Sequence, residues 1–495
     1  MKTLICLTLL VAISSLEAAD SWPQFRGPNA GGVADDELPP VHFGPETNLY
    51  WKIDVPPGVS SPVVSKEFIF LTAFQEGQLL TIAYSAATGR ALWRRTAPAK
   101  EIERCHQFSS PAAPTPCTDG ERIYVYFGSF GVLAYDFAGN EVWQRPFERL
   151  PIEYGTASSP ILAGGKLILQ RDGNSANAQL IALDPASGKT VWEIARPLTG
   201  ACYATPMVWQ HDGIEELMVQ SKGRIAAYGL DGSGPHWWVR GWGFTAVTTP
   251  VAGDGVLVVG GSGSGDPTEP PDPLLNWEKL LKEYDADQDG SLAIEEVPNS
   301  LVWHIRKEIP KEVPGNSFAL RVLLGNFMDR NKDKKVTKEE WDAMVAFTSD
   351  KFNADRLVAV RPGGNEDSTE SHVLWETTRG LSEMPSALYY RGRVHLIRDG
   401  GLWTVIDAKS GNRLVDRKRL GIAGQAVASP IAANGYIYIV SESGTFAVLR
   451  AGESVDIAAI NQLEESVRCT PAIANHTLYV RSTGHLWAFG EPAKP

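Results

Sequence analysis

ALDPASGKTVW, residues 182–192, joins two short β-type runs through a glycine turn and ends on a tryptophan. Similar stretches recur along the chain, and self-similarity at a regular interval indicates a repeat architecture. The tryptophan ends five units, at Trp93, Trp143, Trp192, Trp238 and Trp375. Two later units carry Val415 and Val455 near that position, and Trp51 belongs to an unmatched strand. This marker therefore counts eight units.

A second marker gives an independent count. It is a Ser–Pro or Thr–Pro step followed closely by an apolar strand, as in SPILAGGKLIL, which begins at Ser159. The eight steps begin at Ser61, Thr115, Ser159, Thr205, Thr249, Ser386, Ser429 and Thr470. At Ser386 the proline is replaced by Ala387. Both markers predict eight copies of one unit.

The pattern of each unit predicts a four-stranded antiparallel sheet. Such a sheet cannot bury both faces by itself, so the units are expected to pack around an axis. The last unit ends at LWAFG, Leu486–Gly490, without an outer strand. The spare strand around Trp51 fits there and would cover the exposed sheet edge. We therefore predict an all-β fold, an eight-bladed β-propeller whose N-terminal strand closes the last blade, with the recurring Trp packed between blades.

These motifs resemble a known family. ALDPASGKTVW is similar to the Trp-docking repeat of PQQ-type propellers, found in quinoprotein alcohol dehydrogenases and in the outer-membrane-protein assembly lipoprotein. WPQFRGPN, Trp22–Asn29, and LVAVRPGG, Leu357–Gly364, resemble exported bacterial proteins described as PQQ-like repeat proteins. Most of those proteins have no established activity. The resemblance implies the fold and leaves the chemistry open.

The repeat is interrupted once. Trp238 and Trp375 lie 137 residues apart, whereas neighbouring intervals run from 40 to 50 residues. The excess matches residues 266–354, which we place between the second and third strands of blade five. The expected organisation is a signal peptide at 1–19, propeller at 20–265, a small α-helical insert at 266–354, and propeller at 355–495.

Inside the insert, DADQDGSLAIEE (285–296) provides the ligands that calcium requires of a twelve-residue loop. The candidate ligands are Asp285, Asp287, Asp289, Ser291 through its backbone carbonyl, and Glu296 through both carboxylate oxygens. Gly290 permits the sharp turn within the loop. Apolar residues at helical spacing from Trp277 to Tyr284 predict an entering helix.

A second loop, DRNKDKKVTKEE (329–340), follows the same pattern. Its candidate ligands are Asp329, Asn331, Asp333, Lys335 through its backbone carbonyl, and Glu340. Two such loops with flanking helices resemble an EF-hand pair, which makes calcium the expected cofactor. Loop two should bind less tightly, because it has one carboxylate fewer and Lys334 replaces the turn glycine. A left-handed conformation costs a non-glycine residue roughly 1–2 kcal/mol.

Composition and the first residues indicate the compartment. The formal net charge of −12 argues against nucleic acid or an anionic membrane surface as partner. Residues 1–19 have the layout of a signal peptide, and no later stretch is apolar enough to cross a membrane. We expect a periplasmic or secreted protein. Four cysteines then remain, namely Cys105, Cys117, Cys202 and Cys469. They could form up to two disulfides, although Cys117 reads as a buried strand residue.

The sequence favours a non-catalytic scaffold, or a module that binds a ligand or protein, with a protein or envelope polymer as partner. The alternative is a PQQ-dependent oxidoreductase, yet quinoproteins typically carry adjacent cysteines and none here are neighbours. PQQ is therefore not an expected cofactor. The insert should lie on the propeller face that carries His106, Tyr154, Tyr203 and Arg468, and a catalytic role for His106 is the less favoured interpretation.

Overall fold

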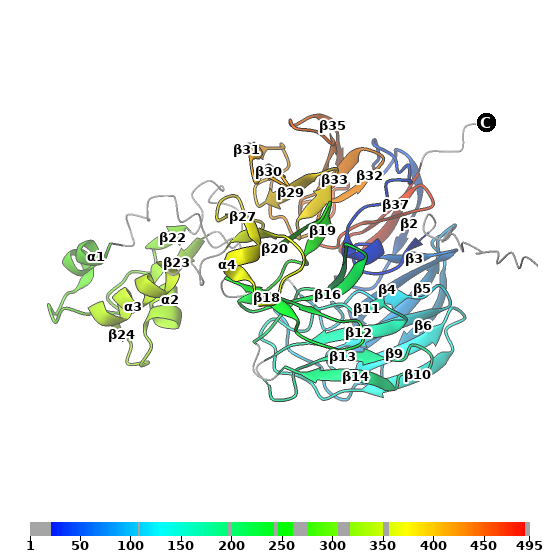
Figure 1. The fold of residues 1–495 in the computed structure, drawn as a ribbon. Coiled ribbons are helices and arrows are strands. Elements are labelled where there is room, and N and C mark those ends of the chain that lie inside the picture. Colours follow the sequence, from blue (N-terminus) through cyan, green and yellow to red (C-terminus); the bar gives the residue numbers. More distant parts are fainter. Residues whose placement is uncertain are drawn as a thin grey trace, which may run out of the picture.

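The computed structural model describes residues 21–106, 109–173, 175–196, 200–241, 246–260, 276–304, 317–349 and 356–490. The expected signal peptide, residues 1–19, lies outside these ranges. The described strands form eight sheets of four or five strands, which Figure 1 shows arranged as blades. The predicted eight-bladed propeller is confirmed.

The first four blades follow the chain in order. Blade one consists of β3 (Val63–Ser65), β4 (Phe68–Gln75), β5 (Gln78–Ser85) and β6 (Ala91–Thr96). Blade two consists of β7 (Cys117–Thr118), β8 (Arg122–Phe127), β9 (Gly131–Asp136) and β10 (Glu141–Pro146). Blade three consists of β11 (Ile161–Ala163), β12 (Lys166–Arg171), β13 (Gln179–Leu183) and β14 (Thr190–Ala195). Blade four consists of β15 (Met207–His211), β16 (Ile214–Ser221), β17 (Arg224–Tyr228) and β18 (Trp237–Arg240).

The remaining blades complete the ring. Blade five consists of β19 (Val251–Gly253), β20 (Val256–Gly260), β25 (Leu357–Val360) and β27 (Val373–Thr377). Blade six consists of β28 (Leu388–Tyr390), β29 (Arg393–Arg398), β30 (Leu402–Asp407) and β31 (Arg413–Arg419). Blade seven consists of β32 (Ile431–Ala433), β33 (Tyr436–Val440), β34 (Thr445–Arg450) and β35 (Ile457–Gln462). Blade eight consists of β36 (Ala472–Ala474), β37 (Thr477–Arg481), β38 (His485–Phe489) and the N-terminal β2 (Leu49–Asp54).

The ring closes through both ends of the chain. Strand β2 pairs antiparallel with β38, with Lys52 opposite Trp487 and Leu49 opposite Phe489. The last blade thus receives its outer strand from the N-terminal part of the chain, as predicted. This pairing covers an edge of β38 that would otherwise expose its backbone hydrogen-bonding groups.

Successive blades are joined by the recurring tryptophans. Trp143 in blade two donates its indole N–H to the carbonyl of Pro185 in blade three, at 2.8 Å. A Cβ atom at Gly188 would lie 2.5 Å from the same indole, so only glycine fits beneath the ring. Equivalent bonds join Trp51 to Ala86, Trp93 to Phe137, Trp192 to Leu230, and Trp375 to Ala408.

Blade four corrects one prediction. The sequence marker assigned the packing position to Trp238, whereas the structure gives it to Trp237. Trp237 pairs with Ala227 as Trp192 pairs with Ala182, so Trp237 holds the equivalent register position. It packs beside Gly364 of the next blade, and Trp238 contacts residues of blades three and four instead. Neighbouring strand residues face opposite sides of a sheet, so a one-residue shift changes the contact surface.

A second set of contacts joins the blades near the axis. At seven of the eight Ser/Thr–Pro steps, the backbone N–H donates to the hydroxyl of the same step in the next blade, as from Ser159 to Thr205 Oγ1 at 3.1 Å. Seven such bonds run from blade one to blade eight. Each hydroxyl satisfies a buried donor of its neighbour, which explains the choice of Ser or Thr. We call the end of the ring where these steps lie the mouth, and the opposite end the floor.

The segment from Ser21 to His42 lies inside the ring at the floor. Strand β1 (Ser21–Trp22) pairs with β3, the innermost strand of blade one. The short η1 turn (Pro28–Ala30) reaches blade four, where Asn29 exchanges two hydrogen bonds with Val208. Further bonds to Thr118, Ala387, Ala432 and Asn475 link the segment to blades two, six, seven and eight. We call these residues the floor segment.

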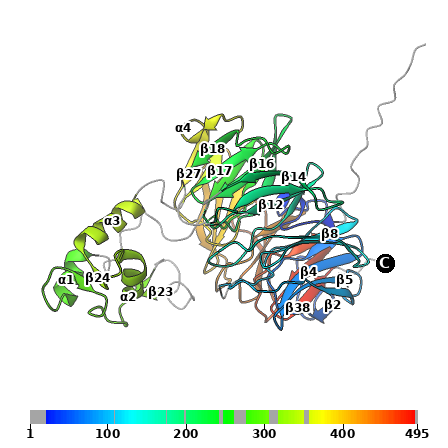
Figure 2. The same ribbon diagram turned by 90° about the horizontal axis from the view of Figure 1, so that it is seen from below.

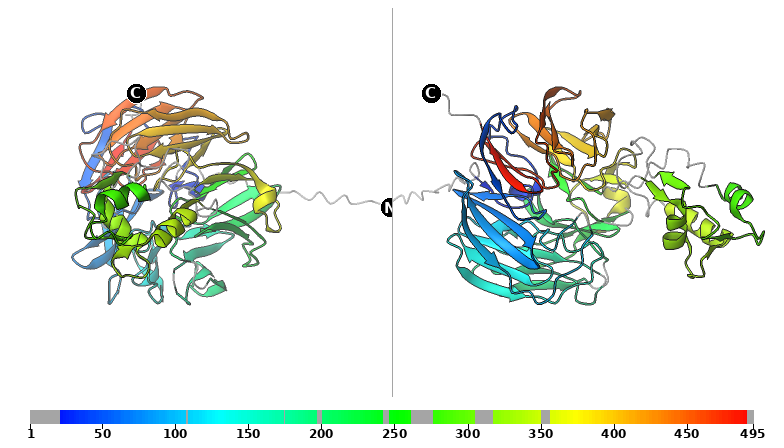
Figure 3. Two further views of the ribbon diagram at one scale, coloured as in Figure 1. Left: turned by 90° about the vertical axis from the view of Figure 1, so that its left-hand side faces the viewer. Right: turned by 180° about the vertical axis from the view of Figure 1, so that it is seen from behind.

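The described part of the insert is a small separate unit. It comprises α1 (Trp277–Tyr284), β21 (Leu292–Ala293), β22 (Val302–His304), β23 (Ser317–Ala319), α2 (Leu320–Leu323), a π-helical turn η2 (Leu324–Met328), β24 (Lys335–Val336) and α3 (Lys338–Ser349). In blade five, β20 pairs directly with β25, so residues 261–356 lie between adjacent strands. Strand β20 ends at the mouth, because Thr248 at the start of that blade donates to the Gly260 carbonyl at 2.6 Å. Figures 2 and 3 show the helices of the insert beside the ring of blades.

Beyond these elements, β26 (Glu366–Asp367) and α4 (Thr369–His372) follow β25. Strand β26 adds to the outer edge of blade four by parallel pairing with β18.

Candidate metal-binding loops

Loop one gathers carboxylates at one point. The side chains of Asp285, Asp287 and Asp289 each offer an oxygen, and these oxygens lie within 4.8 Å of one another. The N–H groups of Asp289 and Gly290 donate to the two oxygens of Asp285, at 3.2 and 3.0 Å. Backbone bonds inside the loop therefore fix the carboxylates in a converging arrangement that suits a hard cation.

Glu296 closes the same loop. Its two carboxylate oxygens accept from the N–H groups of Ala286 and Ala293, at 3.0 and 2.9 Å. The carboxylate thus reaches from the end of the loop to its beginning. Ser291 lies beside Asp289, to which its hydroxyl donates at 2.6 Å. Of the five predicted ligands, the three aspartates are brought together and the glutamate spans the loop.

Loop two repeats these contacts at equivalent positions. The N–H groups of Asp333 and Lys334 donate to the two oxygens of Asp329, at 3.2 and 3.0 Å. Glu340 accepts from Arg330 and Thr337, both at 3.0 Å. Burial acts to raise the pKa of Glu340, but the backbone N–H groups of Thr337 and Arg330 outweigh it and hold that pKa below its usual value. The N–H of Lys335 donates to Asp333 at 2.8 Å, as the N–H of Ser291 does to Asp289 in loop one.

The two loops are paired. Strands β21 and β24 place Leu292 opposite Val336, and both side chains are fully buried. They belong to one apolar cluster with Trp277, Leu280, Val297, Leu320, Leu324, Met328 and Trp341. Both loops are thus held by one shared apolar core.

Two features distinguish the loops. Lys334 has a φ of 69°, compared with 82° for Gly290 at the equivalent position. Lysine adopts this left-handed conformation at an energetic cost that glycine avoids. Asn331 also replaces the central carboxylate of loop one, Asp287. Loop two therefore carries less negative charge and more backbone strain.

A lysine of loop two contacts the acids of loop one. The ammonium of Lys335 binds Asp289 and lies 3.6 Å from Asp287. Its bonds, with those from Ser291, lower the pKa of Asp289 to about 2. The predicted role of Lys335 involves its backbone carbonyl, and this side-chain contact was not predicted from the sequence.

At the mouth, three of the four predicted residues lie together. The rings of His106 and Tyr154 meet edge to face with centroids 5.4 Å apart, and those of Tyr154 and Tyr203 lie 5.8 Å apart. Arg468 is on another blade, where it pairs with Glu442. It lines a cavity of about 420 Å³ between the first and last blades, together with Phe74, Ser109 and Cys469 among others.

The cysteines are poor candidates for nucleophilic chemistry. All four described cysteines are free thiols, and Cys117 is fully buried as predicted. Burial, with the nearby Glu103 carboxylate, raises the pKa of Cys105 to about 12. Burial also raises the pKa values of Cys117, Cys202 and Cys469. A thiol with a raised pKa supplies little thiolate at neutral pH.

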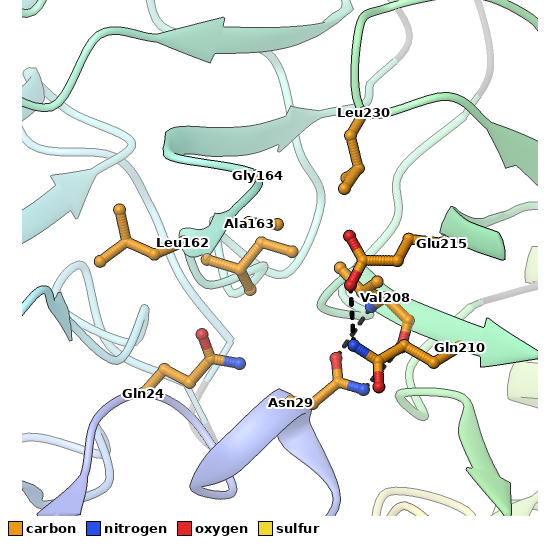
Figure 4. A pocket seen from close by; sticks show the side chains of 10 residues that line it. Gln24, Asn29, Leu162, Ala163, Gly164, Val208, Gln210, Glu215 and Leu230 are labelled. Carbon is orange, nitrogen blue, oxygen red and sulfur yellow. Dashed lines mark hydrogen bonds between the residues drawn. The ribbon is translucent and has the colours of Figure 1, made fainter. Parts of the chain in front are cut away.

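A cavity of about 260 Å³ lies at the floor, beside the floor segment. Figure 4 shows Gln24 and Asn29 facing Leu162, Gly164 and Leu230 of the blades, among others. Its polar groups are largely used within the protein, since Gln210 donates to Glu215 at 2.8 Å and Asn29 bonds to Val208.

Comparisons with known proteins agree with this architecture. Residues 42–269 match the PQQ-repeat family model described as outer membrane protein assembly factor BamB. The structure of BamB from Moraxella catarrhalis is similar, with 13% identity, a TM-score of 0.52, and coverage of 90% of this chain and 98% of that one. The chain is an eight-bladed β-propeller, and its residues 42–269 are similar to PQQ-repeat proteins.

Two dehydrogenases have a similar fold. A europium-containing methanol dehydrogenase has 10% identity and a TM-score of 0.56, over 95% of this chain and 98% of that one. The quinohemoprotein alcohol dehydrogenase of Comamonas testosteroni has 11% identity and a TM-score of 0.52, over 97% and 82%. Identities this low establish the fold alone. No curated protein sequence matches the chain.

Within the described residues of the propeller and its insert, no helix has the length and apolarity needed to cross a membrane. The position of the floor segment was not predicted from the sequence, where WPQFRGPN indicated only a family resemblance. Its Arg26 is the clearest omission, and the signal available in the sequence was an arginine placed within an otherwise apolar and turn-forming stretch.

Proposed function

We propose that this protein is an exported, calcium-binding β-propeller that acts as a non-catalytic scaffold and binds a protein or envelope polymer at its mouth. The insert, residues 266–354, would be an EF-hand pair. The observation that carries the calcium part is the repetition of one hydrogen-bond pattern in two paired loops, each ending on a carboxylate that spans the loop.

The chemistry of the donor set supports calcium. The proposed ligands are all oxygen atoms, from carboxylates, one amide side chain and backbone carbonyls, and Ca²⁺ prefers six to eight such ligands. They are Asp285, Asp287, Asp289, Ser291 and Glu296 in loop one, and Asp329, Asn331, Asp333, Lys335 and Glu340 in loop two. Bound calcium would neutralise the clustered carboxylates and stiffen the helix pair.

The scaffold part is supported by the architecture. The matched family model is described as an assembly factor, and the mouth combines aromatic rings with a cavity between blades. The insert connects to the blade at this same end, since β20 ends there. A partner bound at the mouth would therefore meet both surfaces.

Calcium titration of the purified chain by calorimetry tests the first part. The titration must reach millimolar concentrations, because extracellular modules of this type bind with Kd values of roughly 10⁻⁴ to 10⁻³ M. A double variant, Glu296→Gln with Glu340→Gln, is the matched control and should take up far less. If the unmodified protein shows no heat of binding at these concentrations, the calcium proposal fails.

Capture of partners from envelope extracts tests the second part. The immobilised protein should retain a specific partner, and an excess of calcium chelator should change the amount retained. The same extract passed over the double variant controls for effects of the chelator on other proteins. A partner retained equally by both proteins, with and without calcium, would separate the scaffold role from calcium.

The alternative is a PQQ-dependent oxidoreductase, suggested by the likeness of the fold to two dehydrogenases. Adding PQQ and calcium to pure protein, and then following quinone absorbance and dye-linked alcohol oxidation, distinguishes the two functions. Bound quinone with turnover would overturn the scaffold role.

A further inference from the structure

Three buried arginines of the propeller show how this fold treats an internal cation. Arg196 binds both oxygens of Asp172, at 2.7 and 2.8 Å. Arg481 has no carboxylate partner among the described residues, but its Nη1 and Nη2 donate to four oxygen atoms, those of Ser60 (backbone and hydroxyl), Thr72 and Pro56, and its Nε alone lacks an acceptor there. Arg26 is also fully buried, yet within the described chain it makes one hydrogen bond, to the Ala387 carbonyl at 2.7 Å.

Two of the three guanidinium nitrogens of Arg26 are therefore unsatisfied. Neither Nε nor Nη1 has an acceptor among the described residues, and neither is exposed to solvent. The indole N–H of Trp22, in the same floor segment, is likewise buried without an acceptor. All of these atoms are donors, so any group that completes the site must be an acceptor.

The position of Arg26 is axial. The floor segment lies inside the ring of innermost strands, since β1 pairs with β3 and η1 contacts β15. Arg26 itself reaches blade six, at the one Ser/Thr–Pro step where alanine replaces proline. A Cβ atom on Gly32 would lie 3.0 Å from Arg26 Nη2, so the segment folds closely around the guanidinium. The Arg26 side chain has no surface exposed to solvent.

Among the described residues, Arg26 has no charged partner, just as two of its nitrogens have no hydrogen-bond acceptor. Burial lowers its pKa to about 9, and no charged neighbour contributes to that shift. The side chain is thus still a cation at neutral pH. An isolated buried ion is strongly unfavourable unless it is paired. Water would satisfy the free N–H groups, whereas an anion bound at one of them would also balance the charge.

We propose that the floor of the propeller contains a binding site for a small monovalent inorganic anion of the chloride class, held by Arg26 and completed by an N–H group of the same segment. The two free nitrogens do not lie on one edge of the guanidinium, because Nη2 stands between them and is bonded to Ala387. A carboxylate therefore lacks the paired donors that favour it. A spherical anion needs no such pair.

Bromide is the probe, because it replaces chloride and scatters anomalously. Crystals of the unmodified protein grown in sodium bromide should show an anomalous peak in contact with Arg26 Nε or Nη1. Arg196, equally buried but paired with both oxygens of Asp172, is the internal control and should show none. Water alone at Arg26, with no anomalous peak, would overturn the proposal.

Thermal unfolding in solution tests whether binding occurs at ordinary salt concentrations. At matched ionic strength, about 100 mM bromide should raise the melting temperature by a few degrees over gluconate, since a ligand that binds only the native state stabilises it. The Arg26→Gln variant should lose this difference, and Arg26→Lys should keep part of it. If neither variant folds, the crystal result decides. A peak in the crystal without any difference in solution would mean binding at crystal concentration only, which contradicts a resident anion.

Discussion

Glu296 and Glu340 occupy equivalent ends of the two loops, but their removal should have unequal consequences. Loop one has three clustered aspartates, whereas loop two has Asn331 in the central position and a left-handed lysine. We expect Glu296→Gln to abolish the tighter calcium site and Glu340→Gln to remove only the weaker one. Calorimetric titration of both variants measures this. Two equal and independent sites in the unmodified protein would refute the ranking.

Lys335 should act as an internal competitor of calcium. Its ammonium contacts Asp289 and lies close to Asp287, so calcium must displace it from loop one. Lys335→Met should therefore raise the affinity of loop one by roughly two- to fivefold, which is the range that exposed ion pairs supply. Lys332→Met removes the same charge from a lysine whose ammonium donates to the Gly325 carbonyl, and it serves as the control. Equal effects of both variants in a calcium titration would show that only net charge matters.

The Ser/Thr–Pro steps make a stability prediction. Thr205 accepts from the buried N–H of Ser159 at 3.1 Å, and its own N–H donates to Thr249. Thr205→Val keeps the shape but leaves that N–H without its acceptor, which should lower the free energy of unfolding by about 1–3 kcal/mol. Thr205→Ser retains the hydroxyl and should change it much less. Denaturant unfolding measures the stability of both variants. A similar loss of stability in Thr205→Val and Thr205→Ser would indicate that packing, and not the hydrogen bond, is responsible.

At the scale of strands, closure by β2 should be required for a stable ring. Deleting residues 45–56 leaves the outer edge of β38 without a partner and exposes Trp487, over which Lys52 now lies at 4.1 Å. We expect a large loss of thermal stability and lower solubility. Val142→Ser, on an exposed outer strand away from the closure, is the control. A deletion variant that melts at the same temperature as the full chain would contradict the closing role.

These strands show what the sequence could and could not predict. The position of β2 could be predicted by counting strands, because the last repeat unit lacked its outer strand and the N-terminal part of the chain had one strand too many. The two calcium-type loops could also be predicted, because the candidate ligands of each loop lie within twelve consecutive positions.

The position of the floor segment could not be predicted from the sequence. Its contacts follow no regular spacing and join distant residues, as between Arg26 and Ala387, which are 361 positions apart. The choice of Trp237 over Trp238 depended on strand register, which a marker count does not give.

For the whole molecule, the central question is whether the insert regulates the mouth. Replacing residues 266–354 by a short turn between β20 and β25 should leave the ring folded, because those strands pair without it. If calcium regulates access to the mouth, partner binding by the shortened protein should persist and lose its calcium dependence. Capture assays with and without chelator measure this. Unchanged calcium dependence would show that the insert is not the regulator.

The meeting of both chain ends in blade eight also constrains the order of assembly. Strand β2 can pair only after β38 has formed, and the floor segment contacts blades as late in the chain as blade eight. The N-terminal residues can therefore complete these contacts only when nearly the entire polypeptide has been synthesised. Contacts of such large sequence separation are formed slowly during folding. A partially synthesised chain is then an open arc with an unpaired edge at each end, and it becomes a finished ring only when its beginning and its end meet.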